Sequence, residues 1–212
     1  MSDTIRDRVL AAALPEILQT GFSDATLAVA AEKAGISKRE LRDAFPKSGA
    51  SLVEAFSHWA DRRMIETLAA QEGEQRIRDR IASAVRARIE VLGPHKDATR
   101  RAAAFLAQPP HAALGAQLMM RSVDGMWRAA GDRSSDFSYY TKRATLAGVY
   151  GATFAYWLSD SSEGHAATWT FLNNRIDNVM QFEKFKTAAK DAIAKLPNPL
   201  DFLANLRGKN GR

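Results

Sequence analysis

The sequence of 212 residues contains no cysteine. This absence excludes a disulfide framework, a thiolate zinc site, an iron–sulfur cluster and a cysteine nucleophile. A membrane-spanning run is also missing, because the longest nearly uncharged stretch, residues 144–158, is shorter than the roughly 20 residues that cross a bilayer. The N-terminus also lacks the long apolar run of an export signal, and charges begin at the third residue. We therefore expect a protein that works in a reducing cytoplasm.

The residues that carry enzyme chemistry are scarce as well. The four histidines are scattered, and none belongs to a His-Glu-x-x-His or Glu-x-x-His arrangement that would place metal ligands on one helix face. The sequence has no Gly-x-Gly-x-x-Gly motif, no Walker loop and no Gly-x-Ser-x-Gly motif. We expect no catalytic residue, no metal site and no cofactor, and an enzyme that acts on a lipid is the weakest hypothesis.

What the sequence does contain is apolar residues at helical spacing along almost its whole length, without the alternation typical of strands. This pattern predicts an all-α protein. Glycines and prolines divide the pattern into about ten helices. We expect them over residues 4–20, 26–34, 38–45, 50–71, 74–92, 96–108, 111–130, 136–158, 164–196 and 199–207.

Helix length suggests how these elements are organised. The first three expected helices are short, and most of those that follow are long. We predict a three-helix module over residues 1–48, a larger helical bundle over 49–196, and a short amphipathic helix with a tail over 197–212.

The charge balance favours a polyanionic partner. Thirty lysines and arginines against 24 aspartates and glutamates give a net charge of +6. Nucleic acid and an anionic membrane surface both attract such a chain, so the sign of the charge does not choose between them.

In the expected N-terminal module, residues 21–27 and 30–37 are followed by Leu41 and the Phe45-Pro46 pair. These residues resemble a TetR-type helix-turn-helix. Physically, Gly35 provides the turn between two helices, Ile36 fills the core, and Ser37 caps the next helix.

In a DNA-binding protein of this type, the helix that starts at Lys38 would enter the major groove. Its basic side chains are Lys38, Arg39 and Arg42, but Glu40 and Asp43 on the same helix would face phosphate. We favour a retained helical scaffold over operator binding, and keep a ligand-responsive TetR-type transcriptional regulator as the alternative function.

A further set of segments, spread over much of the chain, contains tryptophan, tyrosine and arginine in a fixed order. These segments are residues 45–46, 52–53, 56, 61–64, 100–105, 124–127, 139–150, 156–158, 160–162, 168–172, 175–176 and 179–184. In these residues the chain resembles the Coq-nine family, a lipid-binding family of ubiquinone biosynthesis.

This resemblance implies a TetR-like fold that no longer regulates transcription, with a homodimer formed through the last long helices. It implies a hydrophobic pocket for a phospholipid or an isoprenoid quinone. The family's role is that of a non-catalytic accessory factor, which presents demethoxyubiquinone-type intermediates to a membrane-associated hydroxylase. We therefore expect the chain at the inner face of the cytoplasmic membrane, bound peripherally, and expect no sequence-specific DNA partner.

Two expected helices carry methionines and aromatic residues that suit a pocket for a flexible isoprenoid tail. Ordinary core packing is the alternative for the same side chains. The candidate lipid-binding residues are Met119, Met120, Val123, Met126, Trp127, Tyr150, Phe154 and Trp157.

Two further surfaces are candidates for contacts. The resemblance assigns Tyr139 and Tyr140 to a patch for the hydroxylase, and we expect at least one of the two rings to be exposed, because adjacent residues of a helix point about 100° apart. The expected C-terminal helix has an apolar side that suits an anionic bilayer, although it could instead seal a groove of the bundle. Its candidate membrane-contacting residues are Leu200, Phe202, Leu203 and Leu206.

Overall fold

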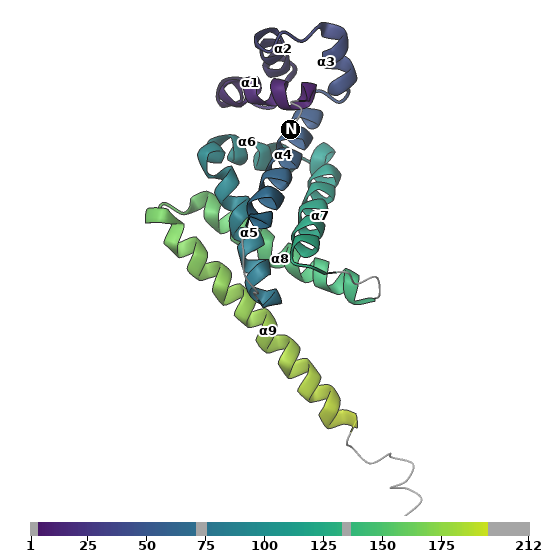
Figure 1. Ribbon diagram of the computed structural model, residues 1–212, viewed down its shortest axis with the longest axis vertical. Coiled ribbons are helices and arrows are strands. Elements are labelled where there is room, and N and C mark those ends of the chain that lie inside the picture. Colours follow the sequence, from purple (N-terminus) through teal and green to yellow (C-terminus); the bar gives the residue numbers. More distant parts are fainter. Residues whose placement is uncertain (1–3, 71–75, 133–136, 195–212) are drawn as a thin grey trace, which may run out of the picture. The chain divides into compact units, whose positions relative to one another are not determined.

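The computed structural model describes residues 4–70, 76–132 and 137–194. Within these ranges the regular elements are helices and no strand occurs, which confirms the all-α prediction (Figure 1). The elements are α1 (Ile5–Thr20), α2 (Asp24–Lys33), α3 (Lys38–Ala44), α4 (Gly49–Ala69), α5 (Ile77–Leu92), η1 (Gly93–His95), α6 (Lys96–Leu106), η2 (Pro109–His111), α7 (Ala112–Ala129), α8 (Phe137–Ser159), η3 (Glu163–His165) and α9 (Ala166–Ala194).

The expected helix boundaries agree with these elements to within a few residues. The helix expected from residue 74 begins at Ile77. The helix expected over 199–207 lies outside the described residues. The chain divides into a compact unit over residues 1–173 and a second unit that starts at Asn174, within α9.

Side-chain caps fix the starts of the first three helices. Thr4 accepts a hydrogen bond from the backbone N–H of Asp7, and Ser23 accepts one from that of Thr26. Ser37 forms a capping box with Glu40, in which each side chain accepts from the other residue's backbone N–H. The turn before it contains Gly35 at φ +65°, a left-handed conformation that glycine adopts without steric cost. The predicted roles of Gly35 and Ser37 are confirmed.

Helices α1, α2 and α3 pack together as a small N-terminal module, and α1 also packs against α4 and α6 of the bundle. The buried apolar residues of the module include Leu10, Ile17, Leu27 and Ile36. Helix α3 itself has no buried residue. The module is therefore held mainly by α1 against α2, and α3 keeps most of its surface in solvent.

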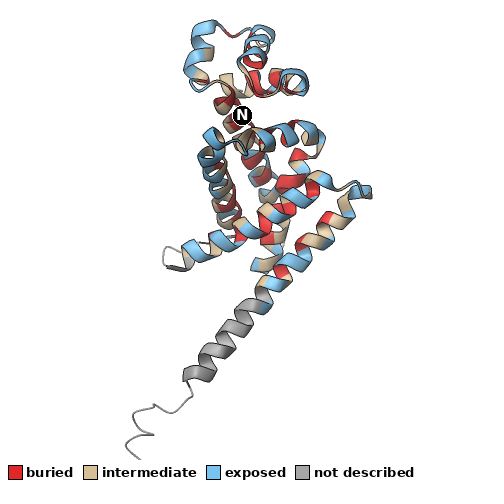
Figure 2. Ribbon diagram, turned by 180° about the vertical axis from the view of Figure 1, so that it is seen from behind, coloured by how far each residue is buried: buried red, intermediate tan, exposed pale blue. Residues whose placement is uncertain are grey.

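Helix α4 connects this module to the bundle formed with α5, α6, α7 and α8 (Figure 1). Its first residue, Gly49, lies so close to the backbone carbonyl of Phe22 that a Cβ atom would overlap it. Further along, α4 packs against α5 and α7, and α7 packs against α8. Buried residues, drawn in red in Figure 2, run along these helices on their facing sides.

Candidate functional site

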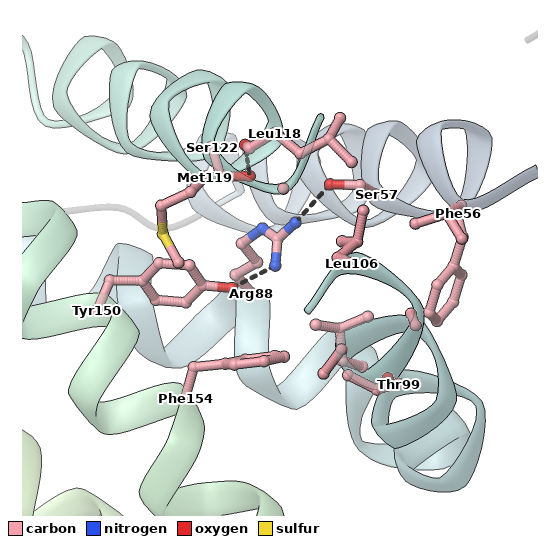
Figure 3. A pocket seen from close by; sticks show the side chains of 15 residues that line it. Phe56, Ser57, Arg88, Thr99, Leu106, Leu118, Met119, Ser122, Tyr150 and Phe154 are labelled. Carbon is pink, nitrogen blue, oxygen red and sulfur yellow. Dashed lines mark hydrogen bonds between the residues drawn. The ribbon is translucent and has the colours of Figure 1, made fainter. Parts of the chain in front are cut away.

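The bundle contains a pocket with a cavity volume of about 100 Å³. Five helices contribute to it, from α4 to α8, and all of its lining residues belong to the compact unit (Figure 3). Most of the lining is apolar. The lining residues are Val53, Phe56, Ser57, Arg88, Leu92, Thr99, Ala102, Ala103, Leu106, Gly115, Leu118, Met119, Ser122, Tyr150 and Phe154.

Burial changes from one side of the pocket to the other. Arg88 is 5% exposed and Tyr150 is 2% exposed, so the polar groups of α5 and α8 lie at the closed end. Leu106, Met119 and Phe154 are only half-buried. The pocket is therefore closed around its polar groups and more accessible where α6, α7 and α8 supply apolar side chains.

Arg88 is the centre of a hydrogen-bond network at the closed end. Its Nε donates to Asp61 Oδ1 at 2.8 Å, and its Nη2 donates to Ser57 Oγ at 3.0 Å. Its Nη1 donates to the Tyr150 hydroxyl. Figure 3 shows the guanidinium between Ser57 and Tyr150, with both bonds dashed. The other carboxylate oxygen of Asp61 is buried without a hydrogen-bond partner in the described residues.

The protonation states at this end follow from burial and from the neighbouring groups. Burial raises the pKa of the Tyr150 hydroxyl, and the nearby Arg88 offsets this only in part. Burial on its own lowers the pKa of Arg88, but Tyr150 and Asp61 raise it and the net shift is upward. Arg88 is therefore a cation paired with Asp61, and Tyr150 is a neutral hydroxyl at neutral pH.

The predicted lipid-binding residues divide into two groups. Met119, Tyr150 and Phe154 line the pocket. The other five lie elsewhere. Val123, Met126 and Trp157 are fully buried outside the lining, and Met120 is 42% exposed. Trp127 is half-buried, and its indole N–H donates to the carbonyl of Lys142 at 3.2 Å.

Arg88, the central polar residue of the pocket, is not among the site residues predicted from the sequence. Ala84, Val85, Arg88 and Leu92 form one buried stripe of α5. A charged residue within such an apolar stripe is the available signal, because arginine is almost never fully buried unless it is paired. Its partner Asp61 occupies a corresponding place on the buried side of α4.

Tyr139 and Tyr140 lie at the start of α8, near the end of α7. Tyr140 is 69% exposed, which agrees with the prediction that at least one ring faces solvent. Tyr139 is half-buried, and its hydroxyl donates to Asp124 Oδ1 at 3.1 Å. The guanidinium of Arg143 lies 3.4 Å from the centre of the Tyr139 ring, and its Nε donates to the same Asp124 oxygen at 2.7 Å.

The remaining candidate residues lie at the two ends of the chain. Lys38, Arg39 and Arg42 are exposed on α3, and so are Glu40 and Asp43. Hydrogen bonds from Ser37 lower the pKa of Glu40, so this side chain keeps its negative charge at neutral pH. The predicted membrane-contacting residues Leu200, Phe202, Leu203 and Leu206 lie outside the described residues.

The described residues also bear on two other classes of site. No cluster of three or more histidines, aspartates or glutamates suitable for a metal ion is found there. Among the same residues, no helix combines the length and the apolar character needed to cross a membrane.

The fold has a clear counterpart among solved structures. A TetR transcriptional regulator from Nitrosomonas europaea superposes with a TM-score of 0.64, over 82% of this chain and 96% of that one, at 23% sequence identity. The protein therefore has a TetR-like fold: a helix-turn-helix module on a larger helical bundle.

The family follows from sequence comparison. The COQ9 family model matches residues 112–183. The mitochondrial ubiquinone biosynthesis protein COQ9 of Rattus norvegicus is 31% identical, over 99% of this chain and 71% of the rat protein. The COQ9 protein of Drosophila melanogaster is 36% identical over 85% of this chain, a match that spans 57% of the fly protein. The chain belongs to the COQ9 family, as the Coq-nine resemblance predicts.

Proposed function

We propose that this chain is a non-catalytic, lipid-binding accessory protein of ubiquinone biosynthesis. It holds a phospholipid or an isoprenoid quinone intermediate and presents it to a membrane-associated hydroxylase of the demethoxyubiquinone type. Family membership supports the pathway, since the relatives are named ubiquinone biosynthesis proteins. The observation that carries the binding role is the pocket between α4 and α8, whose lining is mostly apolar.

The size of the pocket defines what binding requires. A cavity of about 150 Å³ takes up benzene, whereas this one has about 100 Å³. Entry of a substituted ring or an acyl chain therefore needs side chains to move aside. Met119 and Leu106 are suited to this, because both are half-buried at the accessible side and methionine adapts its shape easily.

Other contacts complete the proposal. Tyr139 and Tyr140 form the surface for the hydroxylase, and the apolar residues Leu200, Phe202, Leu203 and Leu206 contact the membrane. A homodimer forms through the last long helices. The protein acts at the surface of the membrane that holds the hydroxylase, which is the inner face of the cytoplasmic membrane in a bacterial cell. The relatives are named as mitochondrial proteins.

Extraction of the purified protein with organic solvent, followed by mass spectrometry, tests the binding role. We expect phospholipid or isoprenoid quinone in stoichiometric amounts. Ala103 is half-buried in the lining, whereas Ala104 is exposed and outside it. Ala103→Trp should therefore remove the lipid, and Ala104→Trp, the same change one position along α6, should keep it. Protein without extractable lipid, or equal lipid in both variants, contradicts the proposal.

A ligand-responsive TetR-type regulator is the second candidate function. The exposed cations Lys38, Arg39 and Arg42 of α3 favour it, as this is the helix that such a regulator inserts into the major groove. Sequence-selective binding of duplex DNA at physiological salt would decide for the regulator.

A further inference from the structure

We propose that Arg143 is a positioning residue for the surface that binds the hydroxylase. It holds the ring of Tyr139 in one orientation, and Tyr139 in turn orients the exposed ring of Tyr140. This inference rests on the proposed function, in which the two tyrosines contact the hydroxylase. It adds a residue that acts on the partner only through another side chain, since the side chain of Arg143 is 4% exposed.

Arg143 is itself fixed by two carboxylates. Its Nε donates to Asp124 Oδ1 at 2.7 Å, and its Nη1 donates to Asp132 Oδ2 at 3.3 Å. The side chain of Asp132 is only 7% exposed, so solvent screens this pair little. The same Nη1 also donates to the backbone carbonyl of Tyr139 at 3.3 Å. These bonds give the planar guanidinium one orientation at the start of α8.

The ring of Tyr139 is held at its face and at its hydroxyl. The guanidinium carbon of Arg143 lies 3.4 Å from the ring centre, a stacked contact between a cation and an aromatic face. The hydroxyl donates to Asp124 Oδ1 at 3.1 Å, the oxygen that also accepts from Arg143. Two contacts at different points of one side chain select a single rotamer.

Tyr140 has its ring in solvent, 69% exposed. It meets Tyr139 edge to face, with ring centres 5.2 Å apart and planes at 77°, an arrangement that aromatic pairs favour. An exposed side chain that changes rotamer freely loses this freedom when a partner binds, which weakens affinity. A fixed Tyr139 therefore prepares the ring of Tyr140 for the partner before contact.

The backbone below the two tyrosines has its own ties to α7. The indole N–H of Trp127 donates to the carbonyl of Lys142 at 3.2 Å. The Nζ of Lys142 donates to Asp132 Oδ1 at 2.9 Å. Neither bond involves Arg143. A change at Arg143 should therefore loosen the ring of Tyr139 without unfolding the start of α8.

Two variants loosen the ring from different sides. Arg143→Lys keeps a cation beside the carboxylates but loses the planar group that stacks on the ring. Asp124→Ala removes the oxygen that accepts from both Arg143 and the Tyr139 hydroxyl. Arg86→Lys is the matched control, because the guanidinium of Arg86 also lies over a ring, that of Trp169 at 4.8 Å, but on α5 and α9.

Surface plasmon resonance with the purified demethoxyubiquinone-type hydroxylase measures the affinity of each variant. Arg143→Lys and Asp124→Ala should each bind about tenfold more weakly than the native chain, the effect of ordering side chains only on binding. Arg86→Lys should bind as the native chain does. Circular dichroism at the assay temperature shows that each variant is folded, and extraction shows that its lipid content is unchanged.

The double variant of Tyr139→Ala with Arg143→Lys distinguishes positioning from a general structural role. If Arg143 acts through the ring, this variant should bind about as weakly as Tyr139→Ala alone, that is, about tenfold below the native chain. Losses that add to about a hundredfold would overturn the inference. Native affinity in both Arg143→Lys and Asp124→Ala would overturn it too.

The failure of the proposed function gives a different result. In that case Tyr139→Ala and Tyr140→Ala bind the hydroxylase as well as the native chain does. The two tyrosines are then not the partner surface, and the positioning role of Arg143 falls with them. If the tyrosine variants lose affinity and Arg143→Lys and Asp124→Ala keep it, the partner surface stands and the positioning role alone is refuted.

Discussion

The two regions of the compact unit place their charges in opposite ways. In the N-terminal module, the five charged residues of α3 are exposed, and the Lys33–Glu16 ion pair has side chains that are 55% and 24% exposed. In the bundle, the side chains of Arg88 and Asp61 are buried, with only 7% and 10% of their surface exposed. An exposed ion pair contributes about 0–1 kcal/mol, whereas a buried one often stabilises no more than apolar residues of the same volume would.

This difference supports the proposed place of the ligand in the bundle. The exposed charges of α3 are of both signs, and solvent screens them, so the fold tolerates many changes there. The buried pair is costly to desolvate, and it lies against a cavity. Packing alone would be served as well by an apolar pair. We infer that the bundle, and not α3, is the region of this chain shaped for recognition.

The first prediction breaks the buried pair from one side. Arg88→Ala should lower the free energy of unfolding by about 3–5 kcal/mol, because Asp61 is left as a buried, unpaired charge. The double variant Asp61→Asn with Arg88→Gln should lower the free energy of unfolding by clearly less, because it leaves no buried charge unpaired. Lys33→Ala, which breaks the exposed pair, should change stability by about 1 kcal/mol or less. Urea unfolding followed by circular dichroism measures all three, and similar losses for all of them would refute the contrast.

The second prediction concerns the point where the module meets the bundle. Gly49→Ala places a Cβ atom against the Phe22 carbonyl, so the backbone has to shift at a cost of about 1–3 kcal/mol. Gly148→Ala is the control, since a Cβ atom there meets nothing within 4 Å. Because Gly148 lies in the interior of α8, Gly148→Ala should raise the free energy of unfolding by about 0.5–1 kcal/mol. Thermal unfolding distinguishes the two, and a Gly49→Ala variant as stable as the control would contradict the close packing.

The fold was predictable from the sequence because its signals are local. Apolar spacing, Gly35 and the Ser37 cap are properties of short segments, and they place the helices correctly to within a few residues. The pocket is not a local property. The apolar stripe of α7 contains both Val123, which is fully buried outside the lining, and Met119, which faces the cavity. Helical periodicity identifies the buried side of α7 and cannot say which part of it meets another helix.

Arg88 was missed for a related reason. In the sequence, an arginine in a helix with several other charges suggests a solvated face. Only the packing of α5 against α4 brings Arg88 to Asp61, which is 27 residues away in the chain. Likewise, only the folded bundle brings it to Tyr150 of α8. Contacts between residues that are distant in sequence depend on tertiary structure. The polar end of the pocket is therefore seen only in the folded protein.

The third prediction separates the two tyrosines that we propose as the surface for the hydroxylase. Tyr140→Ala removes a ring that is 69% exposed, so stability should change by no more than about 0.5 kcal/mol. Tyr139→Ala should lower the free energy of unfolding by about 1–2 kcal/mol, because it removes the hydrogen bond to Asp124 and the ring contact with Arg143.

Binding measurements complete this test. Both variants should weaken binding to a demethoxyubiquinone-type hydroxylase by about tenfold, the effect of losing an aromatic anchor, while lipid content stays unchanged. Surface plasmon resonance with the purified hydroxylase measures the affinity. If Tyr140→Ala binds the hydroxylase as well as the native chain does, the exposed ring is not part of the partner surface.

The last prediction returns to α3 and has the smallest effect. The helix carries three cations and two anions, all of them exposed, and hydrogen bonds from Ser37 lower the pKa of Glu40, which further favours its charged form. Duplex DNA should therefore bind through charge alone, with a dissociation constant of about 1 μM or weaker at physiological salt. Lys38→Ala should reduce the slope of log affinity against log salt by about one unit without a change in sequence preference.

Arg128→Ala in α7, whose side chain is 72% exposed, is the control for a cation outside the module. Fluorescence anisotropy over a salt series measures both slopes. Nanomolar binding to one DNA sequence, abolished by Lys38→Ala and kept by Arg128→Ala, would instead make α3 a recognition helix and reverse the comparison of the two regions.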